Sequence, residues 1–125
     1  MIKKLLKYKY SILWVTIMLV CCTIKIDMPK MDKDSFHLQI PHFDKIVHCV
    51  IFMILTALIC IETRYVELSN KIKILIISAL FGFTIEVIQY FEPWRSFDLW
   101  DLAADILGAY LGILMSKYLI TRIYK

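Results

Sequence analysis

The sequence of 125 residues lacks the patterns that identify common metal sites, disulfide frameworks and repeat proteins. It contains no HExxH or comparable metal-binding motif, which leaves the case for a bound metal weak. Its 4 cysteines fall within apolar runs without CxxC spacing, which favours small thiols that face lipid or the protein core. Glycine and proline occur only 3 times each, and internal repeats and low-complexity tracts are absent. What remains is a chain dominated by apolar residues.

Four long apolar stretches take up most of this chain. Hydrophobic residues make up 60% of the sequence, whereas a typical soluble domain has about 45–50%. A helix that crosses the hydrocarbon of a membrane needs roughly 20 mostly apolar residues, about 17–25 in practice. Such stretches lie at about 10–26, 45–61, 72–91 and 99–120. Because they leave no room for a separate soluble domain, we expect residues 1–125 to form a single membrane domain, an all-α integral membrane bundle of about four transmembrane helices.

The first apolar stretch suits either a cleaved signal or a retained helix. Four lysines within residues 3–9, followed by a short apolar core, are typical of a secretory signal. However, no small-x-small cleavage pattern follows, and the residue before Cys21 or Cys22 is not the Gly, Ala or Ser of a lipoprotein signal. We therefore expect a retained helix, and cleavage stays an open alternative.

The distribution of lysine and arginine predicts the orientation in the membrane. With four crossings and the N-terminus inside, ten basic residues lie inside and five outside. The inside set is Lys3, Lys4, Lys7, Lys9, Arg64, Lys71, Lys73, Lys117, Arg122 and Lys125, and the outside set is Lys25, Lys30, Lys33, Lys45 and Arg95. This bias predicts a multi-pass protein of the plasma (inner) membrane with both termini cytoplasmic. The net charge of +4 then reflects contact with anionic lipid and gives no reason to expect nucleic acid.

Nine polar or ionisable side chains lie near one end of the last three apolar stretches. They are Asp44, Lys45, His48, Glu86, Gln89, Arg95, Asp98, Asp101 and Asp105. In the predicted topology the second stretch runs inward, the third runs outward and the fourth runs inward again. All nine positions are therefore expected to converge on the outer leaflet, where they would form a single outward-facing polar site.

Helical spacing places these residues on shared faces. His48 follows Asp44 by four positions and Gln89 follows Glu86 by three, so each pair lies on one face of its helix. A carboxylate at mid-depth in a membrane costs at least about 2.5 kcal/mol, so such residues normally face the bundle interior and mark function.

Three glycines predict close approaches between helices. Gly108 and Gly112 form a GxxxG step, and Gly82 lies one turn before Glu86. GxxxG is a weak motif by itself, because it is compatible with a dimer face as well as with a contact inside one chain.

Together these residues resemble the VanZ-like family of small membrane proteins. The matching runs are Asp44-Lys45-x-x-His48-x-x-x-Phe52, Gly82-x-x-x-Glu86-x-x-Gln89, and Arg95-x-x-Asp98-x-x-Asp101 followed by the Gly108/Gly112 pair. They cover a core of about residues 43–114. Asp105 is a departure, since the family usually has Asn there. The resemblance implies a bundle of about four helices and a link with teicoplanin (glycopeptide) resistance, and it implies no particular reaction.

Each polar residue also has a simpler structural interpretation. His48 alone would be a hydrogen-bonded packing residue, Glu86 with Gln89 a clamp between helices, and Asp98 a helix N-cap. Arg95 and Asp98 would form an ion pair in a turn. A clamp needs only one or two polar pairs, whereas this chain gathers five carboxylates, two cations, a histidine and a glutamine on one side. That concentration favours a functional site.

The charge balance of the site separates the candidate functions. Five acids against Lys45 and Arg95 leave three excess negative charges when His48 is neutral. Either a divalent cation lies among His48, Glu86 and Asp101, or one or two acids stay protonated. The leading hypothesis is an uncharacterised envelope protein that binds a ligand at its outer face and affects glycopeptide sensitivity, without an evident cofactor or assigned catalytic residue.

The runner-up hypothesis is a metal-assisted hydrolase or transferase that acts on a lipid-linked cell-wall precursor. A transporter ranks third, because four helices provide too little wall for alternating access unless the protein oligomerises. The expected partners are membrane lipids and a lipid-linked envelope intermediate, and the sequence leaves the oligomeric state open.

Overall fold

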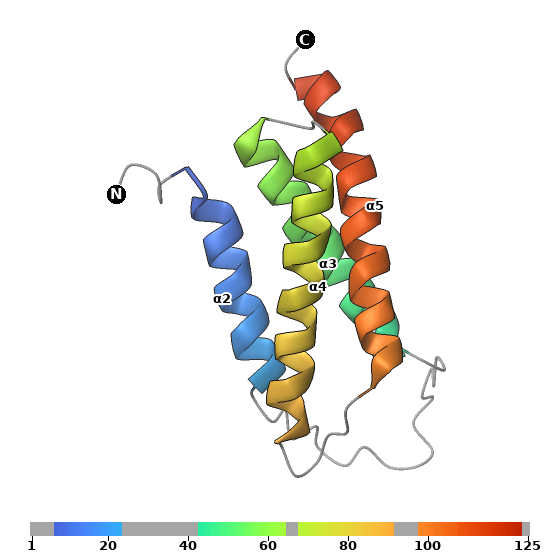
Figure 1. Cartoon of the computed structure of the whole chain (residues 1–125). Coiled ribbons are helices and arrows are strands. Elements are labelled where there is room, and N and C mark those ends of the chain that lie inside the picture. The colour runs from blue at the N-terminus through green and yellow to red at the C-terminus, as the bar shows by residue number, and fades with distance from the viewer. Residues whose placement is uncertain (1–6, 24–42, 65–67, 92–97, 124–125) are drawn as a thin grey trace, which may run out of the picture.

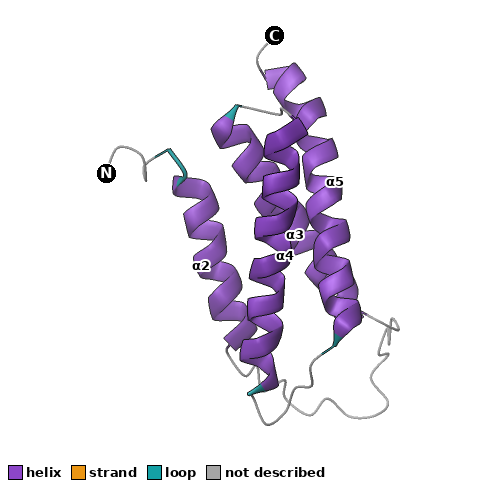
Figure 2. Cartoon of the chain, viewed as in Figure 1, coloured by secondary structure: helices purple, strands orange, loops and turns teal. Residues whose placement is uncertain are grey.

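The computed structural model describes residues 7–23, 43–64, 68–91 and 98–123, which fold as four helices in alternating directions (Figure 1). The helices are α2 (Lys9–Thr23), α3 (Phe43–Thr63), α4 (Leu68–Tyr90) and α5 (Leu99–Ile123). Figure 2 shows that the described residues form helices with short loop segments at some of their ends, without a strand. The predicted all-α fold class is therefore confirmed.

Helices α3, α4 and α5 each extend at one end or both beyond the apolar stretches from which they were predicted. α4 begins at Leu68, whereas its apolar stretch begins at about residue 72, because the polar residues from Ser69 to Lys71 continue the helix. Helical hydrogen bonds do not depend on the polarity of the side chains, so a helix can run past the edge of the hydrocarbon.

Three of the helices are long and apolar enough to cross a membrane. Their candidate spans are Asp44–Thr63, Ser69–Tyr90 and Leu99–Arg122. α2 has 15 residues, about 22 Å at 1.5 Å per residue, and is shorter than the roughly 30 Å hydrocarbon core. The range 10–26 predicted for this helix continues past Thr23 into residues outside the described part. Within its described residues the chain is thus a membrane bundle with three helices long enough to span and a shorter apolar one.

The apolar core lies where α2, α3 and α4 meet. Met18, Phe52, Leu55 and Ile85 are buried there, and the ring of Phe52 lies 5.9 Å from that of Phe81, centroid to centroid. Large apolar side chains also cover the outer surface of the bundle, including exposed Ile76, Leu80 and Leu114. Such exposure suits helices that face lipid, since lipid tails are as apolar as these side chains.

α3 and α5 approach so closely that two positions accept only glycine. A Cβ added to Gly108 would overlap the backbone carbonyl of Cys49, and one added to Gly112 would overlap Met53 and Thr56. Because both neighbours belong to α3 of the same chain, the glycine pair serves a contact within the bundle. Of the two interpretations that the GxxxG spacing left open, the structure therefore supports the contact inside one chain.

Two polar side chains bond across helix interfaces in the middle of the bundle. The hydroxyl of buried Thr56 lies 3.0 Å from the carbonyl oxygen of Ala109, which joins α3 to α5. The indole Nε1 of Trp14 donates to the carbonyl of Ile51 at 3.0 Å, which joins α2 to α3. Hydrogen bonds between helices replace the water that the membrane interior cannot supply.

Glu62, near the end of α3, accepts hydrogen bonds from the first residues of α2. Its Oε1 accepts a hydrogen bond from the backbone N–H of Tyr10 at 2.8 Å, and its Oε2 accepts from the N–H and the hydroxyl of Ser11. The first N–H groups of a helix have no partner within the helix, and a negative charge there is stabilising. A residue of α3 therefore caps α2.

Candidate functional site

The described polar residues of the predicted site lie at one end of the bundle. α3 begins, α4 ends and α5 begins at this end, which lies at the bottom of Figure 1. The acidic end, as we name it, consists of Asp44, Lys45, His48, Glu86, Gln89, Asp98, Asp101 and Asp105. Arg95, the ninth predicted member, lies outside the described residues.

Lys45 is the central cation of the acidic end. Its Nζ donates to Asp44 Oδ2 at 3.0 Å, to Asp98 Oδ2 at 2.7 Å and to Asp101 Oδ1 at 2.9 Å. An ammonium group has three N–H donors, so all of them are used. Hydrogen bonds between charged groups are stronger than neutral ones, and two of these three link α3 to the start of α5.

Among the described residues, His48 and Asp105 form the most deeply buried ionisable pair. His48 Nδ1 lies 2.9 Å from Asp105 Oδ1, and the side chains are 7% and 0% exposed. A carboxylate on one imidazole nitrogen fixes the orientation of the ring, as it does for many histidines whose other nitrogen binds a metal. The extra carboxylate at position 105 thus positions His48.

Gly82 makes room for the second oxygen of Asp105. A Cβ at Gly82 would lie 2.5 Å from Asp105 Oδ2 and 3.2 Å from its Cβ. The sequence predicted that Gly82 allows a close approach between helices. The structure shows that the group admitted there is a carboxylate of α5.

Three buried polar atoms of the acidic end have no hydrogen-bond partner among the described residues: Glu86 Oε1, Gln89 Nε2 and Asp105 Oδ2. Glu86 is 0% exposed and Gln89 is 2% exposed. An unsatisfied buried polar group costs about 1–3 kcal/mol, and in a native structure it points to a water, an ion or a functional role. Two acceptors and one donor are therefore available to a ligand.

Asp98 ties the start of α5 to the other two spanning helices. Its Oδ1 accepts from the N–H of Trp100 at 2.8 Å, the geometry of the N-cap that the sequence predicted. Its own backbone N–H donates to Glu86 Oε2 at 3.1 Å, and its Oδ2 accepts from Lys45. The beginning of α5 is therefore held by α3 and α4 together.

Two sets of three residues in the acidic end bring donor atoms within 4.8 Å of one another. The first set, Asp44, Asp98 and Asp101, surrounds the ammonium of Lys45. The second set is His48, Glu86 and Asp101, all buried. One imidazole nitrogen with carboxylate oxygens suits Zn²⁺, Mn²⁺ or Fe²⁺. The three residues proposed from the sequence as metal ligands therefore fit a divalent cation by chemistry and by distance.

The fold and this site define a small membrane-embedded helical protein with a buried acidic cluster at one end of its spanning helices. The chain belongs to the VanZ/LLP1 family, whose model matches residues 4–121. It is also 30% identical over 80 residues to an uncharacterized protein of Schizosaccharomyces pombe, an alignment that covers 63% of this chain. The chain spans 49% of the length of that relative. No solved structure matches the chain.

Proposed function

We propose that this protein acts in the cell envelope, where its acidic end faces outward, binds an envelope ligand and thereby affects sensitivity to glycopeptides such as teicoplanin. The observation that carries this proposal is the set of three polar atoms on Glu86, Gln89 and Asp105 that have no partner among the described residues, all buried between membrane-spanning helices. Polar groups at such positions are expensive and typically functional. The link to glycopeptides comes from the family resemblance.

The charges at the two ends of the bundle support an outward acidic end. Among the described residues, Lys45 is the basic residue of the acidic end, and seven others lie toward the opposite end. These seven are Lys7, Lys9, Arg64, Lys71, Lys73, Lys117 and Arg122. Because basic residues favour the cytoplasmic side, this distribution supports the orientation predicted from the sequence.

The charge of the site indicates the kind of ligand. The acidic end contains five acids and one described lysine, so an isolated phosphate would be repelled. A ligand with an amino group or several hydroxyl groups would instead donate to Glu86 Oε1 and Asp105 Oδ2, and it would accept from Gln89 Nε2.

A deletion strain complemented with variants tests this proposal through its teicoplanin tolerance. We expect Glu86→Gln to lose complementation while the amount of protein in the membrane stays near normal. Asp44→Asn is the matched control, since Asp44 is an exposed acid at the same end of the bundle. Full complementation by Glu86→Gln, or no effect of the deletion itself, would contradict the proposal.

A second candidate function is metal-assisted hydrolysis or transfer on a lipid-linked cell-wall precursor. The convergence of His48, Glu86 and Asp101 favours it, as does the orientation of His48 by Asp105. A divalent ion held there would supply Lewis-acid assistance to water or a phosphoryl oxygen. Its positive charge would also offset the repulsion of a phosphate by the surrounding acids.

Metal content of the purified protein separates the two candidates. The second predicts that the chain binds Zn²⁺ or Mn²⁺ at one equivalent, and that Glu86→Gln and His48→Gln lose it. Asp44→Asn belongs to the set around Lys45 and should retain the metal. If wild type binds no metal at one equivalent, or if Asp44→Asn loses it equally, the metal-assisted function is wrong.

A further inference from the structure

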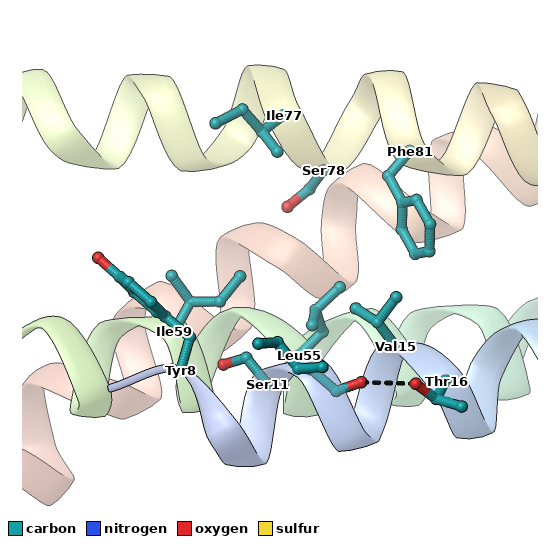
Figure 3. Close-up of a pocket in the computed structure, with 10 residues that line it drawn as sticks. Tyr8, Ser11, Val15, Thr16, Leu55, Ile59, Ile77, Ser78 and Phe81 are labelled. Atoms are coloured by element: carbon teal, nitrogen blue, oxygen red, sulfur yellow. Dashed lines mark hydrogen bonds between the residues drawn. The ribbon is translucent and has the colours of Figure 1, made fainter. Parts of the chain in front are cut away.

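A groove lies between α2, α3 and α4, away from the acidic end (Figure 3). Its volume is about 420 Å³, within the range of about 300–1,000 Å³ that is typical of small-molecule sites. In Figure 3, side chains of α4 face those of α2 and α3 across the groove. The main apolar contributors are Val15, Leu55, Ile59, Ile77 and Phe81.

The groove continues into a second, more polar hollow at the end of the bundle opposite the acidic end. This hollow has a volume of about 400 Å³ and shares Tyr8, Ile59 and Ile77 with the first. Lys7 and Lys73 are the charged members among the described residues that line it. The combined groove thus has an apolar inner part and a positively charged outer part.

Regular spacing along α4 produces this change in polarity. Lys73, Ile77 and Phe81 follow one another at intervals of four residues, so they lie on one face of the helix. From Lys73 to Phe81 this face extends about 12 Å at 1.5 Å per residue. It runs from the edge of the span toward the middle of the membrane, the direction that a lipid takes from its head group to its acyl chains.

The two lysines of the groove, Lys7 and Lys73, are not paired with the carboxylate of Glu62. Glu62 is the described acid at this end of the bundle, and its carboxylate accepts from Tyr10 and Ser11 of α2. Lys7 and Lys73 are exposed, so their ammonium groups are accessible to an anion. Basic pockets between transmembrane helices are a common site for anionic lipid head groups.

We propose that this groove binds one anionic membrane phospholipid, with an acyl chain between α2 and α4 and the phosphate at Lys7 and Lys73. A phospholipid fits better than a soluble ligand because Ile12 and Ile77 at the groove are exposed on helices whose surroundings are lipid. An acyl chain gains little by moving from the bilayer into an apolar groove. Selectivity therefore depends on the phosphate and the two lysines. This site is independent of the function proposed for the acidic end.

Native mass spectrometry of the purified full chain tests the proposal. The protein is exchanged into an equimolar mixture of phosphatidylglycerol and phosphatidylcholine with identical acyl chains. We expect wild type to retain one phosphatidylglycerol in preference, and each of Lys7→Gln and Lys73→Gln to reduce that preference about fivefold. Lys117→Gln with Arg122→Gln is the control, because it removes two charges from the end of α5, outside the groove.

Ser78→Leu provides a second, independent test. Ser78 is buried and lines the groove, so a leucine there should fill the space and reduce retention of both lipids. The lysine variants are at exposed positions and decide the question even if Ser78→Leu fails to fold. The proposal is wrong if the preference survives the loss of both lysines or falls equally in the control. It is also wrong if Ser78→Leu leaves lipid retention unchanged and instead dissociates a dimer.

Discussion

Gly82 on α4 and Asp105 on α5 fit together, with the missing side chain of one giving space to the carboxylate of the other. Asp105 in turn holds His48 of α3 at 2.9 Å. A glycine on α4 therefore influences, through Asp105 of α5, the position of an imidazole on the preceding helix, α3. We expect Gly82→Ala to lower stability by about 1–3 kcal/mol, the usual cost of overpacking, as measured by thermal unfolding in detergent. Thr84→Ala, at an exposed position on the same helix, should have no effect.

Gly108→Ala should be more damaging than Gly82→Ala. The added Cβ would meet the backbone carbonyl of Cys49, whereas at Gly82 it meets a side chain that can move. The only relief is separation of α3 from α5, which also breaks the contact between Thr56 and Ala109. We expect a loss of at least about 3 kcal/mol. Equal unfolding temperatures for the two variants would show that the helices are less tightly packed than in the structure.

Lys45 and Asp101 should be energetically coupled. Their side chains are 21% and 12% exposed, between the exposed pairs that contribute about 0–1 kcal/mol and the buried pairs whose disruption costs about 3–5 kcal/mol. A double-mutant cycle with Lys45→Gln and Asp101→Asn should give a coupling of about 1–3 kcal/mol. The same cycle with Asp44→Asn, whose side chain is 58% exposed, should give a smaller value. Additive losses in both cycles would contradict the central role of Lys45.

The orientation of the bundle is testable by labelling single cysteines in a cysteine-free background. Ser35 belongs to the 27–43 connection, which is predicted to lie outside, and Ser69 lies at the start of α4, at the end with excess basic residues. In intact spheroplasts, an impermeant reagent should label Ser35→Cys and not Ser69→Cys. The reverse pattern would invert the proposed topology and place the acidic end in the cytoplasm.

Loss of function should result from substitutions of the buried polar residues of the acidic end, and not from substitutions on the lipid-facing surface. We expect Asp101→Asn and His48→Gln to abolish any glycopeptide tolerance at near-normal membrane abundance. Arg95→Lys tests the predicted role of Arg95 in the same assay, since lysine does not reproduce the planar donor array of arginine. Ile76→Val and Leu114→Ile, at exposed apolar positions, should be silent. If the polar variants lose protein in proportion to tolerance, the cluster is a structural clamp.

The sequence predicted the convergence of the polar residues because only the order and direction of the helices are needed for it. Alternating helices place the start of α3, the end of α4 and the start of α5 at one end. The metal-ligand candidates His48, Glu86 and Asp101 followed from the same reasoning, and their donor atoms lie within 4.8 Å of one another. The all-α class required only the length and polarity of the apolar stretches.

The individual partners could not be predicted, because they depend on how each helix is rotated and which helices are neighbours. Lys45 reaches three carboxylates on two elements, and the sequence did not distinguish this from a pairing with any one of them. Glu62 bonds to Tyr10 and Ser11, which precede it by 52 and 51 positions. The sequence does not predict this cap, because a single acid at a helix end is usually solvated. The groove between α2 and α4 has no sequence signature, because it forms between helix faces whose residues show no distinctive pattern in the sequence.

The cap that Glu62 places on α2 also constrains the order of assembly. α2 is synthesised before α3, because domains and their helices emerge from the ribosome N-terminal end first. The N–H groups of Tyr10 and Ser11 therefore have no carboxylate until α3 is nearly complete. The start of α2 reaches its final bonding only after α3 has crossed the membrane. Glu62 thus forms a contact late in biogenesis, and this contact joins the first helix to the rest of the bundle.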